Sequence, residues 1–204
     1  RMIDTIIEAL HENGINEIYV VVGYLKEAFQ NLPNEIKGIT LIENPYFDTC
    51  NNISSLYVAK DYISNAIIID GDQIVTDSTI LSSEFENSGY NCVWQENDTK
   101  EWMLTLDDHY KVLSCSRTGG NHAWQLYGIS RWTKEDGIKL KELLELEFKE
   151  KKNTQIYWDD IAMFEHFDKF NLQGYPMHAG GVKEIDSLDE LIEEDSSYRY
   201  YKGE

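Results

Sequence analysis

The stretch Ile67-Ile68-Ile69-Asp70-Gly71-Asp72 decides the fold. Three consecutive β-branched residues predict a short strand buried on both faces, which is typical of a parallel sheet. Two carboxylates separated by a glycine follow, and in open α/β sheets ligands bind just outside the carboxyl ends of the strands. A carboxylate at this place suits Mg²⁺, which takes one or two carboxylates together with phosphate oxygens. A plain acidic turn would explain the same residues, because Asp and Gly are common turn residues.

The composition is that of a globular chain with a strong negative charge. Its 204 residues are 42% hydrophobic and carry a formal net charge of -19. This charge argues against nucleic acid as a partner, because nucleic-acid binding needs basic surfaces. We expect no membrane span, since no apolar run of about 18 residues occurs. Cys50, Cys92 and Cys115 have no metal-type spacing and predict free thiols in a cytoplasmic protein.

Strands and helices alternate in the first part of the chain. The predicted strands cover residues 18–22, 39–42 and 67–69, and the predicted helices cover residues 2–10, 25–32, 52–61 and 78–84. Such alternation predicts an α/β fold with a doubly wound, mostly parallel central sheet and right-handed crossovers. We find no domain boundary and expect a single domain over residues 1–204.

The second part of the chain adds antiparallel strands to this sheet. The predicted strands cover residues 90–95, 102–106, 111–115 and 124–130. A long helix over 134–151, a helical segment over 159–168 and an extended segment over 177–184 follow. Ser187 is the predicted N-cap of a last helix over 188–194. The tail over 195–204 carries no clear fold signal.

Two further groups of residues could carry chemistry. Glu184 and Asp186 flank Ile185, so on a strand both carboxylates point to the same side, and Asp186 could meet Asp72 across a metal ion. By itself, Asp186 would simply precede the helix N-cap.

Aromatic residues stand next to acids at 101–102 and at 157–160. Trp102 and Tyr157 could surround a cation, because aromatic faces attract ammonium groups, although core packing would explain each ring singly. Asn51 or Asn52 is expected to cap the helix that follows, and the other amide is free to bind a base or a phosphate.

Several short motifs follow one another in a characteristic order along the chain. They are Gly14-Ile15-Asn16, Val22-Gly23-Tyr24-Leu25-Lys26-Glu27, Asn51-Asn52-Ile53, Ser55-Leu56-Tyr57, Ile69-Asp70-Gly71-Asp72, Glu101-Trp102, Tyr157-Trp158-Asp159 and Glu184-Ile185-Asp186-Ser187. Taken together they resemble the bacterial CTP:phosphocholine cytidylyltransferases, within the sugar-nucleotidyltransferase-like superfamily. The resemblance implies a nucleotide-diphospho-sugar transferase-like fold.

The resemblance also implies an activity and its residues. Members of this family transfer CMP from CTP to phosphocholine with Mg²⁺ and release pyrophosphate. The positions of Asp72 and Asp186 are those of metal-binding aspartates. Those of Trp102 and Tyr157 are aromatic positions around choline, and Asp159, Glu184 and Asn52 are carried over as substrate-binding residues. The expected partners are CTP and a phosphocholine-like small molecule.

One feature of the family has no counterpart here. The family begins with a strand and a Gly-rich loop that cradles the triphosphate, whereas residue 1 already lies in a helical pattern. We therefore expect the first strand to be absent from this chain, and the chain alone to be inactive.

Three alternatives stay open at this point. The chain could act on another phospho-amine or phosphonate, such as 2-aminoethylphosphonate. It could be a metal-dependent glycosyltransferase, because Asp70-Gly71-Asp72 is a D-x-D motif. It could also be a non-catalytic module with a nucleotidyltransferase-like fold.

Overall fold

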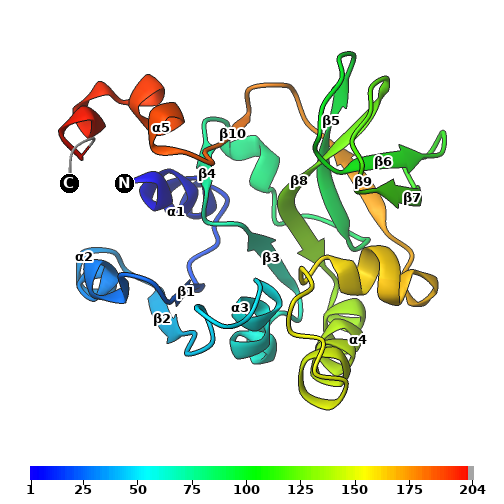
Figure 1. Ribbon diagram of the computed structural model, residues 1–204, viewed down its shortest axis with the longest axis horizontal. Coiled ribbons are helices and arrows are strands. Elements are labelled where there is room, and N and C mark those ends of the chain that lie inside the picture. Colours follow the sequence, from blue (N-terminus) through cyan, green and yellow to red (C-terminus); the bar gives the residue numbers. More distant parts are fainter. Residues whose placement is uncertain (202–204) are drawn as a thin grey trace.

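The computed structural model describes residues 1–201 (Figure 1) and contains two hydrophobic cores. The first core combines the N-terminal elements α1 (Met2–Glu12), β1 (Ile18–Val22), α2 (Leu32–Glu35) and β2 (Ile39–Glu43) with buried residues from later in the chain. The later residues are Val75, Ile80, Leu81, Ile129 and Val182. Strands β1 and β2 pair in parallel, with Ile18 opposite Ile39. Helix α1 buries Ile6, Ile7 and Leu10 in this core, as its apolar spacing predicts.

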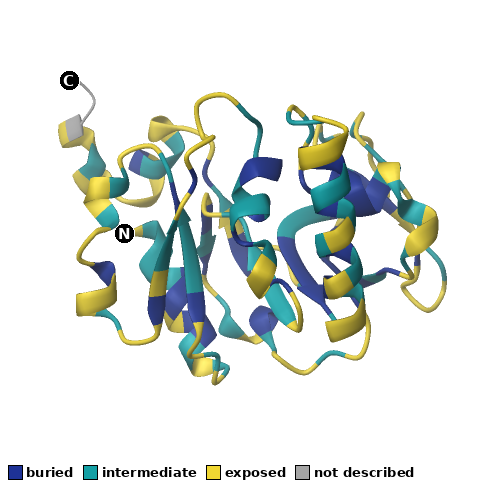
Figure 2. Cartoon of the chain, turned by 90° about the horizontal axis from the view of Figure 1, so that it is seen from below, coloured by how far each residue is buried: buried dark blue, intermediate teal, exposed yellow. Residues whose placement is uncertain are grey.

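The second core lies under a larger sheet in the order β7-β6-β8-β5-β9. These strands are β5 (Gly89–Gln95), β6 (Met103–Leu106), β7 (Val112–Ser116), β8 (Ala123–Trp132) and β9 (Gln173–Pro176). Only β5 and β9 pair in parallel there, and the other pairings are antiparallel. Helix α4 (Lys134–Glu145) packs on this core with Leu140 and Leu144, and Figure 2 marks the buried residues of the chain in dark blue. The mixed α/β class is confirmed.

Strand β3 (Ala66–Ile69) departs from the prediction in its partner. It pairs antiparallel with β8, with Ile68 opposite Ser130, rather than with parallel neighbours. Its residues are half-buried and not buried on both faces. The physical reason is that only one edge of β3 is paired within residues 1–201, while the other faces a groove.

This groove separates β1 from β3 and has a volume of about 900 Å³. Its walls include apolar residues of α1, β1 and β3 together with Asn52 and Trp158. Within the described residues β1 pairs only with β2, so both strands present an unpaired edge to the groove.

Several local predictions are corrected by the structure. Residues 25–32 form a 3₁₀ turn over Lys26–Phe29, and α2 then begins at Leu32 with Pro33 in its first turn, where its missing N–H costs nothing. Residues 78–84 form a short 3₁₀ turn over Ser78–Leu81. Within the extended segment at 177–184 only β10 (Val182–Glu184) is a strand, and the short strands β4 (Gln73–Val75) and β9 were not predicted.

The remaining elements follow the sequence closely. Helix α3 (Ile53–Val58) continues into a 3₁₀ turn, and α4 continues as a π-helical turn to Glu150. The segment at 159–168 is π- and 3₁₀-helical, and α5 (Leu188–Glu194) has the predicted bounds. The tail adds a 3₁₀ turn over Ser196–Tyr201, and residues 202–204 lie outside the described part. No helix in residues 1–201 is long and apolar enough to cross a membrane.

Candidate active site

Asp70, Gly71 and Asp72 connect β3 to β4, at the carboxyl end of β3. The Asp70 N–H donates to the Gly128 carbonyl at 2.8 Å, and the Asp70 carboxyl packs so closely on Gly128 that a Cβ there would collide with it. Burial, followed by the charge of Asp72, raises the pKa of Asp70 to about 6. Asp70 therefore supports the turn from inside, and Asp72 is the exposed carboxylate of the pair.

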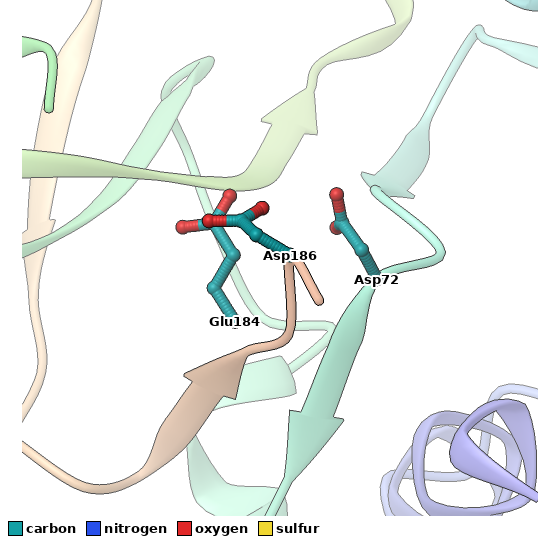
Figure 3. A group of neighbouring side chains, drawn as sticks. All are labelled: Asp72, Glu184 and Asp186. Carbon is teal, nitrogen blue, oxygen red and sulfur yellow. The ribbon is translucent and has the colours of Figure 1, made fainter. Parts of the chain in front are cut away.

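Asp72, Glu184 and Asp186 converge on one point and form the carboxylate cluster (Figure 3). One oxygen from each carboxylate lies within 4.8 Å of the others. Strand β10 pairs antiparallel with β4, and the Ile185 N–H donates to the Asp72 carbonyl at 2.8 Å. The predicted meeting of Asp72 with Asp186 is thus found, but it is β4, and not β3, that lies beside the strand carrying Glu184.

The backbone of Asp186 is held by the start of α5. Its N–H donates to Glu190 Oε2 at 2.7 Å, and Ser187 forms a capping box with the same glutamate. This confirms the predicted cap. Because a capping box fixes the chain entering the helix, the Asp186 carboxylate is supported on a defined backbone.

The carboxylate cluster is electrostatically unfavourable as it stands. Burial, followed by Asp72 and Glu101, raises the pKa of Glu184 to about 7. Burial and the charge of Asp186 raise the pKa of Asp72. A bound cation would relieve this repulsion, and three carboxylates are the hard oxygen donors that Mg²⁺ prefers. The residues present therefore fit the expected ion.

Trp102 and Tyr157 also come together, as predicted, and with Phe164 they form the aromatic wall. The Trp102 ring centroid lies 5.8 Å from that of Tyr157 and 5.3 Å from that of Phe164, both in edge-to-face geometry. Tyr157 is 49% exposed, so its ring is available to a ligand. The sequence did not reveal Phe164, because Tyr157 lies before the helical turn Ile161–Glu165 and no regular spacing links the two rings.

Glu101 connects the aromatic wall to the carboxylate cluster. It precedes Trp102 in the chain, and its charge contributes to the raised pKa of both Glu184 and Tyr127, after burial and other neighbours. The sequence placed Glu101 beside an aromatic but gave it no role. The charge of Glu101 thus acts on Glu184 of the carboxylate cluster from the residue next to Trp102.

Asn52 has a structural partner that the sequence did not reveal. Its Oδ1 accepts the Trp158 N–H at 2.9 Å, and Asn51 Nδ2 donates to the Gln155 carbonyl at 3.2 Å. Asn52 stands at the expected N-cap position of α3, but no side-chain hydrogen bond caps the helix there. The amides instead hold the segment that carries Tyr157, a tertiary role that local sequence cannot show. Binding of substrate by Asn52 stays a prediction.

Asp159 lies in the interior and does not face the aromatic wall from solvent. It is 7% exposed, and its Oδ1 and the Tyr90 hydroxyl have no hydrogen-bond partner among the described residues. Burial, followed by the charge of Asp70, raises the pKa of Asp159 well above its usual range. Its expected contact with substrate stays a prediction.

Comparison with known proteins identifies relatives that span almost the whole chain. No protein-family model matches. The chain is 32% identical to a 2-aminoethylphosphonate cytidylyltransferase of Lancefieldella rimae over 98% of its own length and 81% of that protein. It is 30% identical to a choline-phosphate cytidylyltransferase of Streptococcus pneumoniae over 93% of its length and 81% of that protein.

Solved structures give the same result. The chain is similar to a CTP:phosphocholine cytidylyltransferase of Streptococcus pneumoniae, with a TM-score of 0.88, 28% identity, and 96% and 84% of the two chains covered. An inositol-1-phosphate CTP transferase of T. maritima shares the fold, with a TM-score of 0.72 at 15% identity, covering 97% and 80%.

Proposed function

Because the chain belongs to the cytidylyltransferase family that includes choline-phosphate and 2-aminoethylphosphonate cytidylyltransferases, we propose that it transfers CMP from CTP to phosphocholine or a similar phospho-amine, with release of pyrophosphate. The observation that carries the proposal is the carboxylate cluster, whose oxygens lie within 4.8 Å of one another at the end of a strand. The aromatic wall beside it supports an amine-bearing substrate.

Mg²⁺ is part of this proposal. Asp72 and Asp186 would hold the ion, and Glu184 lies beside them. When bound, Mg²⁺ supplies charge neutralisation at the phosphates, which is the main requirement of phosphoryl-type transfer. The repulsion that raises the pKa of Asp72 and Glu184 means that this cluster gains more from a cation than isolated carboxylates would.

The chain's own residues bind and orient the two substrates. Trp102 and Tyr157 present aromatic surface to the ammonium group, while Glu101 and Glu184 add negative charge. In the reaction, a phosphate oxygen of the amine forms a bond to the α-phosphorus of CTP, the α–β bridging bond breaks, and pyrophosphate takes the electron pair. Positioning of this kind accounts for much of the catalysis in such transfers.

A second substrate, 2-aminoethylphosphonate, is supported by a separate observation. Its primary ammonium can donate hydrogen bonds, which a trimethylammonium group cannot. Glu184 is a half-buried carboxylate near Glu101, and such acceptors suit a primary ammonium. The glycosyltransferase and non-catalytic alternatives have no comparable observation in their favour.

The proposal is tested by measuring pyrophosphate release in the full-length protein. CTP and Mg²⁺ are supplied with phosphocholine, phosphoethanolamine or 2-aminoethylphosphonate in parallel, and a nucleotide sugar serves as the glycosyltransferase control. We expect pyrophosphate in stoichiometric amounts with a CDP- or CMP-linked amine. Absence of pyrophosphate with all three amines would contradict the proposal, and the ratio of kcat/KM values would identify the preferred amine.

A further inference from the structure

Arg117 links two separate parts of the site through a buried carboxylate. It follows β7 directly, and its Nε donates to Asp160 Oδ1 at 3.1 Å, with a second contact from its terminal nitrogen to the same oxygen. The Asp160 side chain is only 4% exposed, whereas that of Arg117 is 46% exposed. The other Asp160 oxygen accepts the Tyr157 N–H at 2.9 Å. The ion pair therefore ends on the backbone of an aromatic-wall residue.

The guanidinium of Arg117 also stacks on the aromatic wall. Its central carbon lies 3.7 Å from the ring centroid of Phe164 and 5.5 Å from that of Trp102. Because Trp102 precedes β6 and Phe164 belongs to the helical segment after Tyr157, Arg117 contacts the rings that come from both elements. A planar guanidinium can stack and pair at the same time, which a lysine ammonium cannot reproduce.

We propose that Arg117 is a positioning residue for the phospho-amine. It holds Trp102 edge-to-face with Tyr157, through stacking on one side and through Asp160 on the other. This inference rests on the proposed function for its substrate, but its structural part stands on the contacts alone. It predicts that Arg117 controls the KM for the amine and leaves CTP and the chemical step nearly unaffected.

Arg117→Lys is the informative substitution, because a lysine still neutralises the buried Asp160 carboxylate and keeps the fold intact. We expect the KM for phosphocholine to rise roughly five- to tenfold, in line with the loss of a well-oriented cation–π contact. The KM for CTP and kcat should change less than about twofold on the same reasoning. Asp160→Asn, which releases the guanidinium, should shift the KM in the same direction.

Lys139→Met is the matched control. Lys139 also lies over an aromatic ring, 5.1 Å from the Phe170 centroid, and pairs with Asp136 at 2.8 Å, but it belongs to α4 outside the site. It should leave every kinetic constant at the wild-type value. Equal kinetic constants in Arg117→Lys and wild type, with active wild-type enzyme, would overturn the proposal while leaving the proposed function untouched.

A second readout needs no activity. The indole ¹H–¹⁵N cross-peak of Trp102, assigned by its loss in Trp102→Phe, should shift in Arg117→Lys and stay in place in Lys139→Met. An unchanged Trp102 cross-peak in Arg117→Lys would overturn the positioning role even if no amine substrate were turned over. Inactive wild type combined with a shifted cross-peak would instead reject the proposed function and retain the contact between Arg117 and Trp102.

Discussion

The carboxylate cluster and the aromatic wall differ in how their charges are balanced. In the cluster, Asp72, Glu184 and Asp186 face one another, and the pKa of Glu184 rises to about 7 through burial and neighbouring acids. In the wall, the guanidinium of Arg117 pairs with Asp160 and stacks on the rings. Among residues 1–201, the cluster thus has no cationic partner like the one that Arg117 provides in the wall. This difference indicates that a bound cation completes the cluster, whereas the wall already has its cation.

The largest effect is expected when a carboxylate of the cluster is removed. Asp72→Asn should lower kcat/KM for CMP transfer at least about a hundredfold, because a charged metal ligand contributes several kcal/mol of charge stabilisation. The melting temperature should not fall, since Asp72 is exposed and its removal relieves repulsion. Asp168→Asn, an exposed carboxylate elsewhere, serves as the control. Turnover near the wild-type value at saturating Mg²⁺ would show that Asp72 is not a ligand.

The next effect concerns the wall and separates two amines. Trp102→Ala should lower kcat/KM for phosphocholine by roughly 30-fold, equivalent to about 2 kcal/mol of desolvated cation–π attraction. Phosphoethanolamine should lose less, because its ammonium can still donate to Glu184. The assay compares both substrates in wild type and variant, with a melting curve alongside. Equal losses for both amines together with a lower melting temperature would mean that Trp102 serves only packing.

A smaller effect concerns the buried Asp159 and the pH dependence of the free energy of unfolding. Asp159 has a pKa raised by burial and by Asp70, so the folded state binds a proton that the unfolded chain releases near pH 4. The contribution of Asp159 to the free energy of unfolding should therefore be fully present below that pH. It should fall as the pH rises towards the pKa in the folded state, by about 1.4 kcal/mol for each unit by which folding raises the pKa. Asp159→Asn removes this dependence.

In urea titrations between pH 5 and pH 8, we expect the free energy of unfolding of the variant to rise relative to that of wild type as the pH increases, because only wild type loses stability when Asp159 ionises. A constant difference across this range would show that Asp159 is ionised in the folded state.

The smallest expected effect tests the support of Asp186. Ser187→Ala should cost about 1 kcal/mol of unfolding free energy, as loss of an N-cap usually does. It should also weaken Mg²⁺ binding, because the capping box fixes the backbone at Asp186. Thr133→Ala removes the N-cap of α4 and should cost similar stability without changing Mg²⁺ affinity. If the two variants bind Mg²⁺ alike, the cap does not support the cluster.

The sequence predicted the regular elements and the residues at strand ends better than it predicted which strands pair with one another. The strand at Ile67–Ile69 and its acidic end were correctly located because β-branched runs and Asp-Gly turns are local signals. The antiparallel pairing of β3 with β8 was not predictable, since a buried strand reads alike in either direction.

The site was foreseen in part for the same reason. Asp72, Asp186, Trp102 and Tyr157 were identified from their types and neighbours, and the structure brings each pair together. Arg117 and Asp160 form their contact across 43 positions, and no local pattern marks such a pair. The hydrogen bond from Trp158 to Asn52 is equally remote in sequence and replaced the expected helix cap.

The central claim is that the carboxylate cluster is a divalent-metal site, and Mn²⁺ titration followed by EPR tests it without any need for turnover. Wild-type full-length protein should bind Mn²⁺ in competition with Mg²⁺, and Asp72→Asn and Asp186→Asn should each weaken binding by at least about tenfold, as loss of a charged ligand requires. Asp168→Asn should bind as wild type does. Unchanged Mn²⁺ affinity in both cluster variants would contradict the account.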